Sequence, residues 1–382
     1  MPEAYIVDAL RTAVGRRGGA LSHVHPADLS AATLTALVER TGIDPAVVDD
    51  VVMGCVDNVG PNMGDIARTA WLTAGLPESV PGVTLDRQCG SSQQAVHFAA
   101  QAVMSGTCDV VVAAGVQNMS MIPMAAAWTL AEPAEYPHPQ LDAKGWVARY
   151  GRQEISQFRG ADLIAEQWEI TREQMEQYAV ESHERAIRAR AEGRFKSEIV
   201  AVDGFDADEC PREPDLAKIR SLPTLRGGGR LTAAVSSQIC DGASAALIVN
   251  EAALSRYGLT PRARIHHLTV LGEDPVKMLT APIPATKRAL ERTGMTLDDI
   301  DLVEINEAFA SVVLAWQRDL NADLSKVNVN GGGISLGHPI GATGVKLMAT
   351  LIAELERTGG RFGLQTMCEG GGQANVTIIE RV

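Results

Sequence analysis

The chain has 382 residues, of which 46% are apolar and 21% are charged, as in ordinary globular proteins. This length suits two or three domains with large cores, and it excludes disorder, collagen and coiled coil as the main character. The Asp and Glu residues number 47 against 34 Lys and Arg, which gives a net charge of −13. General binding to nucleic acid or to an anionic membrane needs a basic face, so we expect neither.

The cysteines and the start of the chain indicate a compartment. No two cysteines form a C-x-x-C pair, and none stands at zinc-type spacing from a histidine, so we expect reduced thiols and no metal site. No basic segment followed by an apolar stretch opens the chain, and no apolar run reaches the ~20 residues of a membrane span. We therefore expect a cytoplasmic protein without a membrane span. The cysteines are Cys55, Cys89, Cys108, Cys210, Cys240 and Cys368.

Short strand-like runs alternate with helical patterns along the chain. Ser91–Ser105 is predicted as a helix, because its apolar residues recur at helical spacing and Gly106 follows as a stop signal. Several strand-like runs are almost continuously apolar, which is typical of strands covered on both faces. The order predicts an α/β fold. The predicted strands are Asp50–Met53, Val83–Leu85, Val110–Ala114, Ala245–Val249, Leu302–Ile305, Val327–Val329, Leu364–Met367 and Val376–Ile379.

The stretch from about 119 to 237 has a different character. It is rich in Pro, Trp, Gln and charged residues and contains few strand candidates. One long helix is predicted there, opened by Thr171 in a capping box with Gln174 and closed near Gly193. We interpret the stretch as an insertion on the α/β body, of the kind that often covers a binding site.

The two halves of the chain follow one pattern. In each half a strand leads to a turn with one chemically capable residue, and a helix and a second strand follow. That residue is Cys89 in the first half and His338 in the second. The pattern indicates a duplicated fold.

Cys89 and His338 are the first candidates for chemistry. At a helix entrance, unpaired N–H groups and the helix dipole favour a thiolate at Cys89, and Arg87 adds positive charge nearby. A buried structural cysteine is the alternative. His338 stands in a run with six glycines between 330 and 344, which lacks the phosphate-loop spacing. It is a candidate base for a thiol, and a glycine-rich turn that merely holds a histidine is the alternative.

Two further residues stand at strand exits. Cys368 precedes three glycines at the end of a predicted strand, and Asn306 follows another strand, where a helix N-cap is its alternative role. Strand exits of open α/β sheets converge on one crevice. We therefore expect a thiol nucleophile, a histidine partner, a polar group for an oxyanion and a second thiol to meet there.

Four segments together resemble the thiolase family, and the resemblance covers essentially the whole chain. It implies a five-layer αβαβα fold of two similar halves with an inserted loop domain. The N-terminal half would span 1–118, completed by 240–261, the CoA-binding loop domain 119–239, and the C-terminal half 262–382. It also implies acyl-CoA and CoA as substrates, no permanently bound cofactor, and a homodimer or homotetramer. The segments are Arg87–Ser92, Asn306–Phe309, Gly337–Gly344 and Cys368–Gly372.

The resemblance also implies the chemistry, which is thiolytic cleavage of a 3-ketoacyl-CoA or the reverse Claisen condensation. Cys89 would carry the acyl group, and His338 would take its proton and help form one oxyanion hole with a water held by Asn306. Cys368 would be the acid and base for the carbon that leaves. The N–H groups of Cys89 and Gly370 would form the second oxyanion hole.

The substrate contacts and specificity follow from the same resemblance. Arg212 would lie near the adenosine end of CoA, Ser237 on the pantetheine, and Arg220 is a further cation of the loop domain. Phe158–Gly160 replaces a His-Met-Gly-like segment of short-chain biosynthetic members, which favours a degradative enzyme for fatty-acid or sterol-derived chains. A biosynthetic acetoacetyl-CoA thiolase and a catalytically silent acyl-CoA-binding or lipid-binding member are the alternatives. Cys368 speaks against a ketosynthase.

Overall fold

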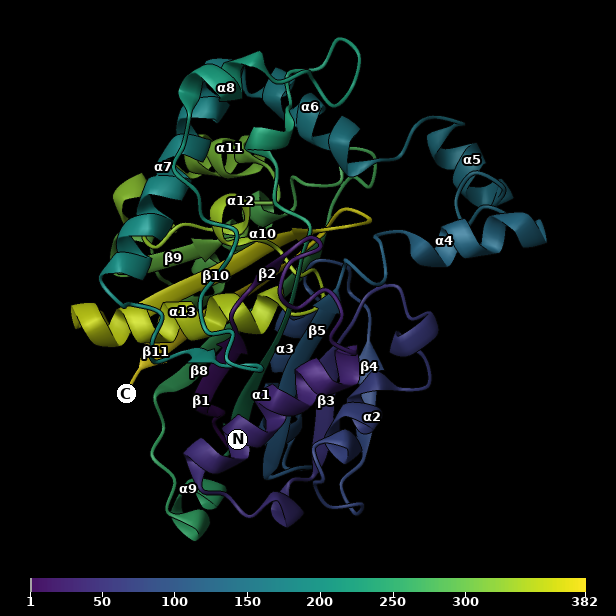
Figure 1. The fold of residues 1–382 in the computed structure, drawn as a ribbon. Helices are drawn as coiled ribbons and strands as arrows, with labels where there is room; N and C mark the ends of the chain where they lie inside the picture. The colour runs from purple at the N-terminus through teal and green to yellow at the C-terminus, as the bar shows by residue number, and fades with distance from the viewer. Residues whose placement is uncertain (1) are drawn as a thin grey trace.

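A computed structural model describes residues 2–382. Their strands form one mixed sheet in the order β4-β3-β5-β7-β1-β8-β11-β10-β9, with short β2 beside β7 and β6 beside β1 (Figure 1). The strands are β1 (Tyr5–Thr12), β2 (Gly15–Arg16), β3 (Asp50–Gly54), β4 (Gly82–Leu85), β5 (Val110–Asn118), β6 (Ile199–Val200), β7 (Cys240–Val249), β8 (Ala263–Gly272), β9 (Leu302–Ile305), β10 (Phe362–Glu369) and β11 (Gln373–Arg381).

The helices connect these strands and fill the insertion. The α-helices are α1 (Pro26–Thr41), α2 (Ile66–Thr73), α3 (Ser91–Ser105), α4 (Ala126–Ala131), α5 (Lys144–Tyr150), α6 (Gln157–Gln167), α7 (Arg172–Ala191), α8 (Leu216–Ser221), α9 (Glu251–Tyr257), α10 (Pro282–Thr293), α11 (Ala310–Leu320), α12 (Gly333–Leu336) and α13 (Thr343–Thr358). None of these described helices is long and apolar enough to cross a membrane.

The sheet consists of two halves with the same strand order. In the first half the order is β4-β3-β5-β7-β1, and in the second β9, β10, β11 and β8 repeat the last four places. The place of β4 belongs in the second half to the strand predicted at Val327–Val329, which is reduced to a parallel bridge between Val327 and Val303 of β9. The halves join where Tyr5 and Ile6 of β1 pair with β8. The predicted duplication is therefore confirmed.

Helices α3 and α13 form the central layer between the two halves. They contact each other, α3 contacts β3 and β5, and α13 contacts strands of both halves. Val96 and Val103 of α3 share a core with Val345 and Met348 of α13. On the outer faces, α1 and α2 cover the first half, while α10 and α11 cover the second. The predicted five-layer αβαβα fold is confirmed (Figure 1).

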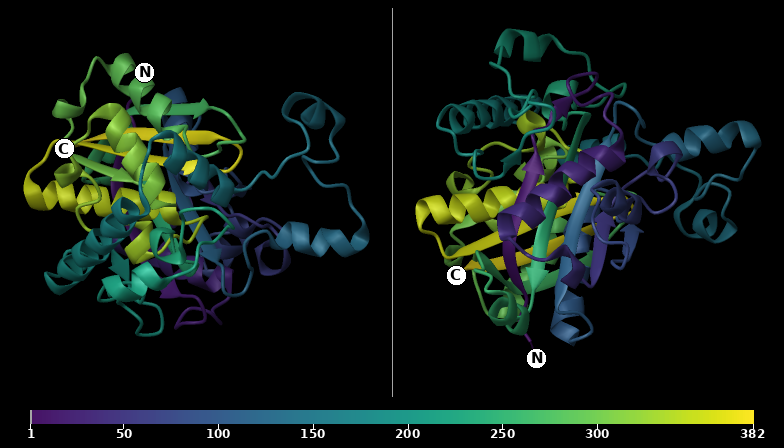
Figure 2. Two further views of the ribbon diagram at one scale, coloured as in Figure 1. Left: turned by 90° about the horizontal axis from the view of Figure 1, so that it is seen from above. Right: turned by 60° about the horizontal axis from the view of Figure 1, so that its bottom comes forward.

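The insertion carries α4 to α8 and only the two-residue strand β6. Its longest helix, α7, begins after Thr171 in the predicted capping box with Gln174. Helices α6 and α7 pack on α11, and α7 also packs on α12. Helices α4 and α5 project from the body as an arm, as the two views of Figure 2 show.

Candidate active site

The entrances of the two central helices lie against each other. A Cβ atom on Gly344, at the start of α13, would stand 2.0 Å from the backbone nitrogen of Gln93 in α3, so only glycine permits this approach. The N–H of Val345 donates a hydrogen bond of 3.1 Å to the hydroxyl of Ser92. The turn that holds Cys89 and the loop that holds His338 are thereby brought together.

Cys89 is half-buried, one residue before the Gly90 that precedes α3. Burial, followed by the negative charge of Glu369, raises the pKa of its thiol to about 12. The backbone N–H groups of Cys89 and Gly370 donate toward the sulfur and lower the pKa in part. The expected stabilised thiolate is therefore wrong for the resting protein, because burial and a carboxylate outweigh the helix entrance. The two N–H groups do converge on this sulfur.

Cys368 lies near Cys89, fully buried near the end of β10. Burial, and then the charge of Cys89, raises the pKa of the Cys368 thiol well above its ordinary value. The segment with Asn306 reaches the same strand, since the Asn306 N–H donates to the carbonyl of Thr366 at 3.0 Å. The structure thus brings both predicted thiols into one place.

The hydrogen bonds of His338 define its tautomer. Its Nδ1 lies 2.6 Å from Oγ1 of Thr343, whose hydroxyl donates to the carbonyl of Pro339 at 2.8 Å. The hydroxyl proton is thereby used, so Nδ1 carries a proton and donates it to Oγ1. Nε2 is left with a lone pair, 3.3 Å from the amide nitrogen of Asn306. Burial, and then the charge of Lys346, lowers the pKa of His338 to about 3, so the ring is neutral at neutral pH.

Asn306 does not cap a helix. Helix α11 begins at Ala310 after Phe309, so the alternative role as an N-cap is wrong. Asn306 is 1% exposed, and its Oδ1 has no hydrogen-bond partner among the described residues. Because a buried amide oxygen without a partner is costly, this atom can hold a water or a substrate group beside His338.

The predicted CoA contacts divide into two groups. Ser237 precedes Gln238, whose carbonyl accepts from the N–H of His338 at 3.2 Å and whose Oε1 accepts from Nη1 of Arg212 at 3.0 Å. Ser237 and Arg212 are therefore connected to the site. Arg220 lies apart, exposed on the short helix α8. Gln238 was not predicted, since a glutamine in a loop gives no signal of the loops it joins.

Glu307 ties the insertion to the site and was also missed. Its buried carboxylate accepts from the hydroxyls of Tyr178 and Ser182 on α7, at 2.8 and 2.7 Å. It also accepts from Nδ2 of Asn328 and from the N–H of Ile334, at 3.2 and 3.1 Å. Its position after Asn306 in the Asn-Glu-Ala-Phe segment was the available signal. It fixes the loop on which Asn306 stands.

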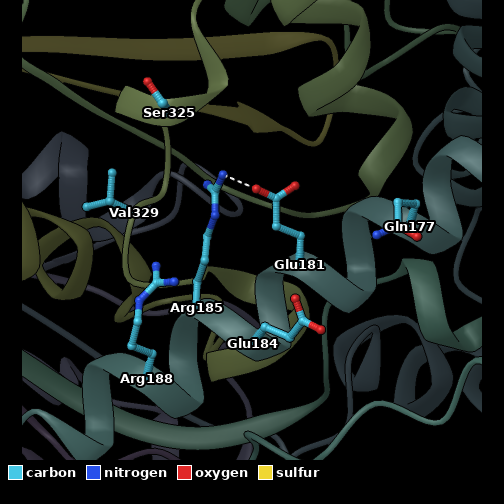
Figure 3. A pocket seen from close by; sticks show the side chains of 7 residues that line it. All are labelled: Gln177, Glu181, Glu184, Arg185, Arg188, Ser325 and Val329. Carbon is cyan, nitrogen blue, oxygen red and sulfur yellow. Dashed lines mark hydrogen bonds and ion pairs between the residues drawn. The ribbon is translucent and has the colours of Figure 1, made fainter.

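A cavity of about 460 Å³ lies elsewhere, between α7 and the segment that holds Ser325 and Val329 (Figure 3). It contains none of the predicted site residues, and its Arg185 is held by Glu181 and by the carbonyl of Val327. Within residues 2–382, no group of three or more His, Cys, Asp or Glu side chains is arranged to hold a metal ion. We do not assign a function to this cavity.

Comparison with known proteins agrees with this geometry. Residues 4–252 match the family model for the thiolase N-terminal domain, and residues 259–381 match that for the C-terminal domain. The chain belongs to the thiolase family. This thiolase is 60% identical to the steroid 3-ketoacyl-CoA thiolase FadA6 of Mycobacterium tuberculosis, over 100% of this chain and 95% of that one. It is 40% identical to a beta-ketoadipyl-CoA thiolase of Acinetobacter baylyi, over both full lengths.

Solved structures give the same result for the fold. The Bacillus anthracis acetyl-CoA acetyltransferase superimposes with a TM-score of 0.88 at 37% identity, covering 100% of this chain and 99% of that one. Human mitochondrial 3-ketoacyl-CoA thiolase in complex with CoA gives 0.88 at 32% identity, covering 100% and 98%. This thiolase is accordingly an acyltransferase.

Proposed function

We propose that this thiolase cleaves a 3-ketoacyl-CoA with CoA, giving acetyl-CoA or propionyl-CoA and a shortened acyl-CoA through an acyl group on Cys89. One observation carries the proposal: the thiols of Cys89 and Cys368 lie close together. In addition, the N–H groups of Cys89 and Gly370 are directed at the sulfur of Cys89. One thiol can carry an acyl group while the other exchanges a proton.

The first step forms a carbon–sulfur bond. The sulfur of Cys89 attacks the 3-keto carbon, and its proton passes to the lone pair on Nε2 of His338. The resting thiol and imidazole are both neutral, with pKa values of about 12 and about 3, so proton transfer accompanies the attack. The oxyanion formed on the former ketone oxygen would accept from the N–H groups of Cys89 and Gly370.

The second step breaks the bond between C2 and C3. Its electron pair moves into the thioester as an enolate, and the ketone carbon becomes a thioester on Cys89. Protonated Nε2 of His338 is now a donor, so it and a water on Asn306 would stabilise the enolate oxygen. The thiol of Cys368 gives its proton to C2, which releases acetyl-CoA or propionyl-CoA and leaves the shortened acyl group on Cys89.

The third step transfers the acyl group to CoA. The thiolate of Cys368 takes the proton of the CoA thiol, and the CoA sulfur attacks the thioester on Cys89. The leaving Cys89 sulfur recovers its proton from His338. The two thioesters are similar in energy, so this acyl transfer is nearly balanced. By microscopic reversibility the same residues would serve the reverse Claisen condensation.

Several features support the more detailed assignments. Arg212 and Ser237, joined to the His338 loop through Gln238, are proposed to contact CoA, with Arg220 as an outer cation. The named steroid substrate class of the 60% identical relative supports a ring-bearing or other bulky acyl chain from sterol or fatty-acid breakdown. The protein is proposed to act in the cytoplasm.

We also propose a homodimer or homotetramer. The edge strand β4 supports this, because it leaves one edge of the sheet unpaired and its Val83 is 46% exposed. Light scattering should give a dimer or a larger assembly, and a monomer would contradict the assignment.

A cleavage assay tests the function. The protein should cleave at least one member of a panel of short, long, branched and ring-bearing 3-ketoacyl-CoAs in the presence of CoA. Cleavage of acetoacetyl-CoA alone would favour the biosynthetic alternative, and no cleavage at all would favour a silent acyl-CoA-binding protein.

Single variants separate the two thiols. Cys89→Ala should lose both acylation and cleavage, whereas Cys368→Ala should still become acylated at Cys89 but lose cleavage. Cys108→Ser, a half-buried thiol away from these residues, is the matched control and should keep both activities. Equal loss of both reactions in Cys368→Ala would refute its separate acid and base role.

A further inference from the structure

Glu369 is a buried carboxyl that the reaction scheme does not use. It ends β10 between Cys368 and Gly370 and is 0% exposed. Neither oxygen makes a hydrogen bond within 3.5 Å among the described residues, and the backbone N–H of Asn375 is the donor directed toward the carboxyl. A Cβ atom added to Gly90 would stand 1.9 Å from its Oε1. The carboxyl is therefore aimed at the backbone immediately after the nucleophile. A buried group of this kind without a partner calls for an explanation.

Within the described part of the chain, no cation is paired with Glu369 to compensate a negative charge on its carboxyl. Arg87 is the cation that acts on it, but Nη1 of Arg87 donates to Oε1 of Gln373 at 2.8 Å, and no ion pair within 4.0 Å joins Arg87 to Glu369. The other titratable groups around it are Cys89, with Asp86 acting on that thiol from the same turn, and Cys368 beside it on β10.

The strand β11, which pairs with β10, presents uncharged Gln373 and Asn375 here. Burial then dominates and disfavours the ionised carboxyl, which raises the pKa of Glu369 to about 8. Glu369 is also the leading charge among the causes that raise the pKa of Cys89.

We propose that Glu369 is a positioning residue for the nucleophile, a buried carboxyl behind the Gly90 turn that must keep its proton for the Cys89 thiolate to form. The inference rests on Cys89 as the proposed nucleophile. The proton that leaves Cys89 goes to Nε2 of His338, and Glu369 keeps its own. When Glu369 is ionised, the pair already carries one negative charge, and a second charge on the Cys89 sulfur is opposed.

This coupling predicts a particular pH dependence of the Cys89 thiolate. Below the pKa of Glu369 the thiolate population rises tenfold per pH unit, as for any thiol. Above that pKa the neutral form of Glu369 declines in the same proportion, so the thiolate population stays level until Cys89 itself titrates. An uncoupled thiol would show no such plateau.

The test measures alkylation of Cys89 by iodoacetamide between pH 6 and pH 9, with the rate read from the Cys89 peptide by mass spectrometry. Glu369→Gln keeps the shape of the neutral carboxyl and cannot ionise. We expect wild type and variant to react equally at pH 6.5, and the variant to react about 10-fold faster at pH 9, one unit above the pKa of about 8. Glu39→Gln, at an exposed glutamate of α1 with no ion pair within 4.0 Å among the described residues, is the matched control and should follow wild type.

The outcomes are distinct. If the ratio of the alkylation rates of Glu369→Gln and wild type is the same at every pH, the coupling is refuted, whether that ratio is 1 or some other value. A merely structural change would not depend on pH. If the variant does not fold, the wild-type profile alone decides: a plateau above about pH 8 supports the coupling, and a continued tenfold rise per unit refutes it. Alkylation of the Cys89 peptide is measured without catalytic turnover. The test can therefore be carried out even if the protein shows no thiolase activity.

Discussion

The same carboxyl should make stability depend on pH, and this dependence can be calculated. The pKa of Glu369 is raised from 4.5 to about 8 in the folded protein. Between pH 4.5 and about pH 8, Glu369 is therefore protonated in the native state but ionised in the unfolded chain. The free energy of unfolding falls as the pH rises through this range. Glu369→Gln removes this dependence. The variant should gain stability over wild type as the pH rises, and the gain should fade at acid pH.

The size of the effect follows from the two pKa values. The linkage cost of Glu369 is about 1 kcal/mol at pH 5 and about 4 kcal/mol at pH 7.5. The difference in free energy of unfolding between Glu369→Gln and wild type should therefore change by about 3 kcal/mol between these two conditions. The side chain is 0% exposed, so solvent screening does not reduce this figure.

Urea denaturation of both proteins at one protein concentration, at pH 5 and at pH 7.5, measures the change. Glu39→Gln on the surface controls for loss of a negative charge in general. A difference between variant and wild type that is the same at both pH values would refute the reasoning, because it would mean that Glu369 titrates normally in the folded protein.

Three further predictions concern packing and orientation. Thr343→Val removes the acceptor for Nδ1 of His338, so the acylation rate of Cys89 should fall about 10-fold or more with the Michaelis constant for CoA unchanged, and Thr343→Ser should restore it. Gly90→Ala should destabilise the protein by about 1–3 kcal/mol through contact with Glu369, and equal costs in the wild-type and Glu369→Ala backgrounds would contradict that contact. Arg11→Met removes the paired guanidinium of buried Glu198 and Asp208, which leaves Lys346 as the remaining buried cation that acts on them, and should cost about 3–5 kcal/mol in urea unfolding, so a neutral result would show that they take up protons instead.

The sequence predicted those helices that begin and end at signals given by neighbouring residues, such as a capping box or a glycine stop. Helix α3 runs from Ser91 to Ser105 as predicted, because its apolar spacing and the Gly106 stop are both local. The capping box of Thr171 and Gln174 likewise fixed the start of α7. Strand β8 was not predicted, because His266 and His267 interrupt its apolar run, and pairing with β1 and β11 forms it.

The site divides in the same way. The four motifs named the residues that we propose carry the chemistry, since thiols, histidine and asparagine at strand exits can be read directly from the sequence. Their electrostatic state was not visible. The helix entrance suggested a thiolate at Cys89, whereas its pKa is about 12, because burial and Glu369, 280 positions away, decide it.

The sequence by itself therefore determined the family and the duplicated layers and pointed to the two thiols proposed for catalysis, because motif order, periodicity and capping are properties of neighbouring residues. Only the tertiary structure decided the neutral tautomer of His338, the unpartnered oxygen of Asn306 and the buried carboxyl behind Gly90. These depend on burial and on distances between segments that the chain brings together from both halves, and such quantities exist only once the layers have packed.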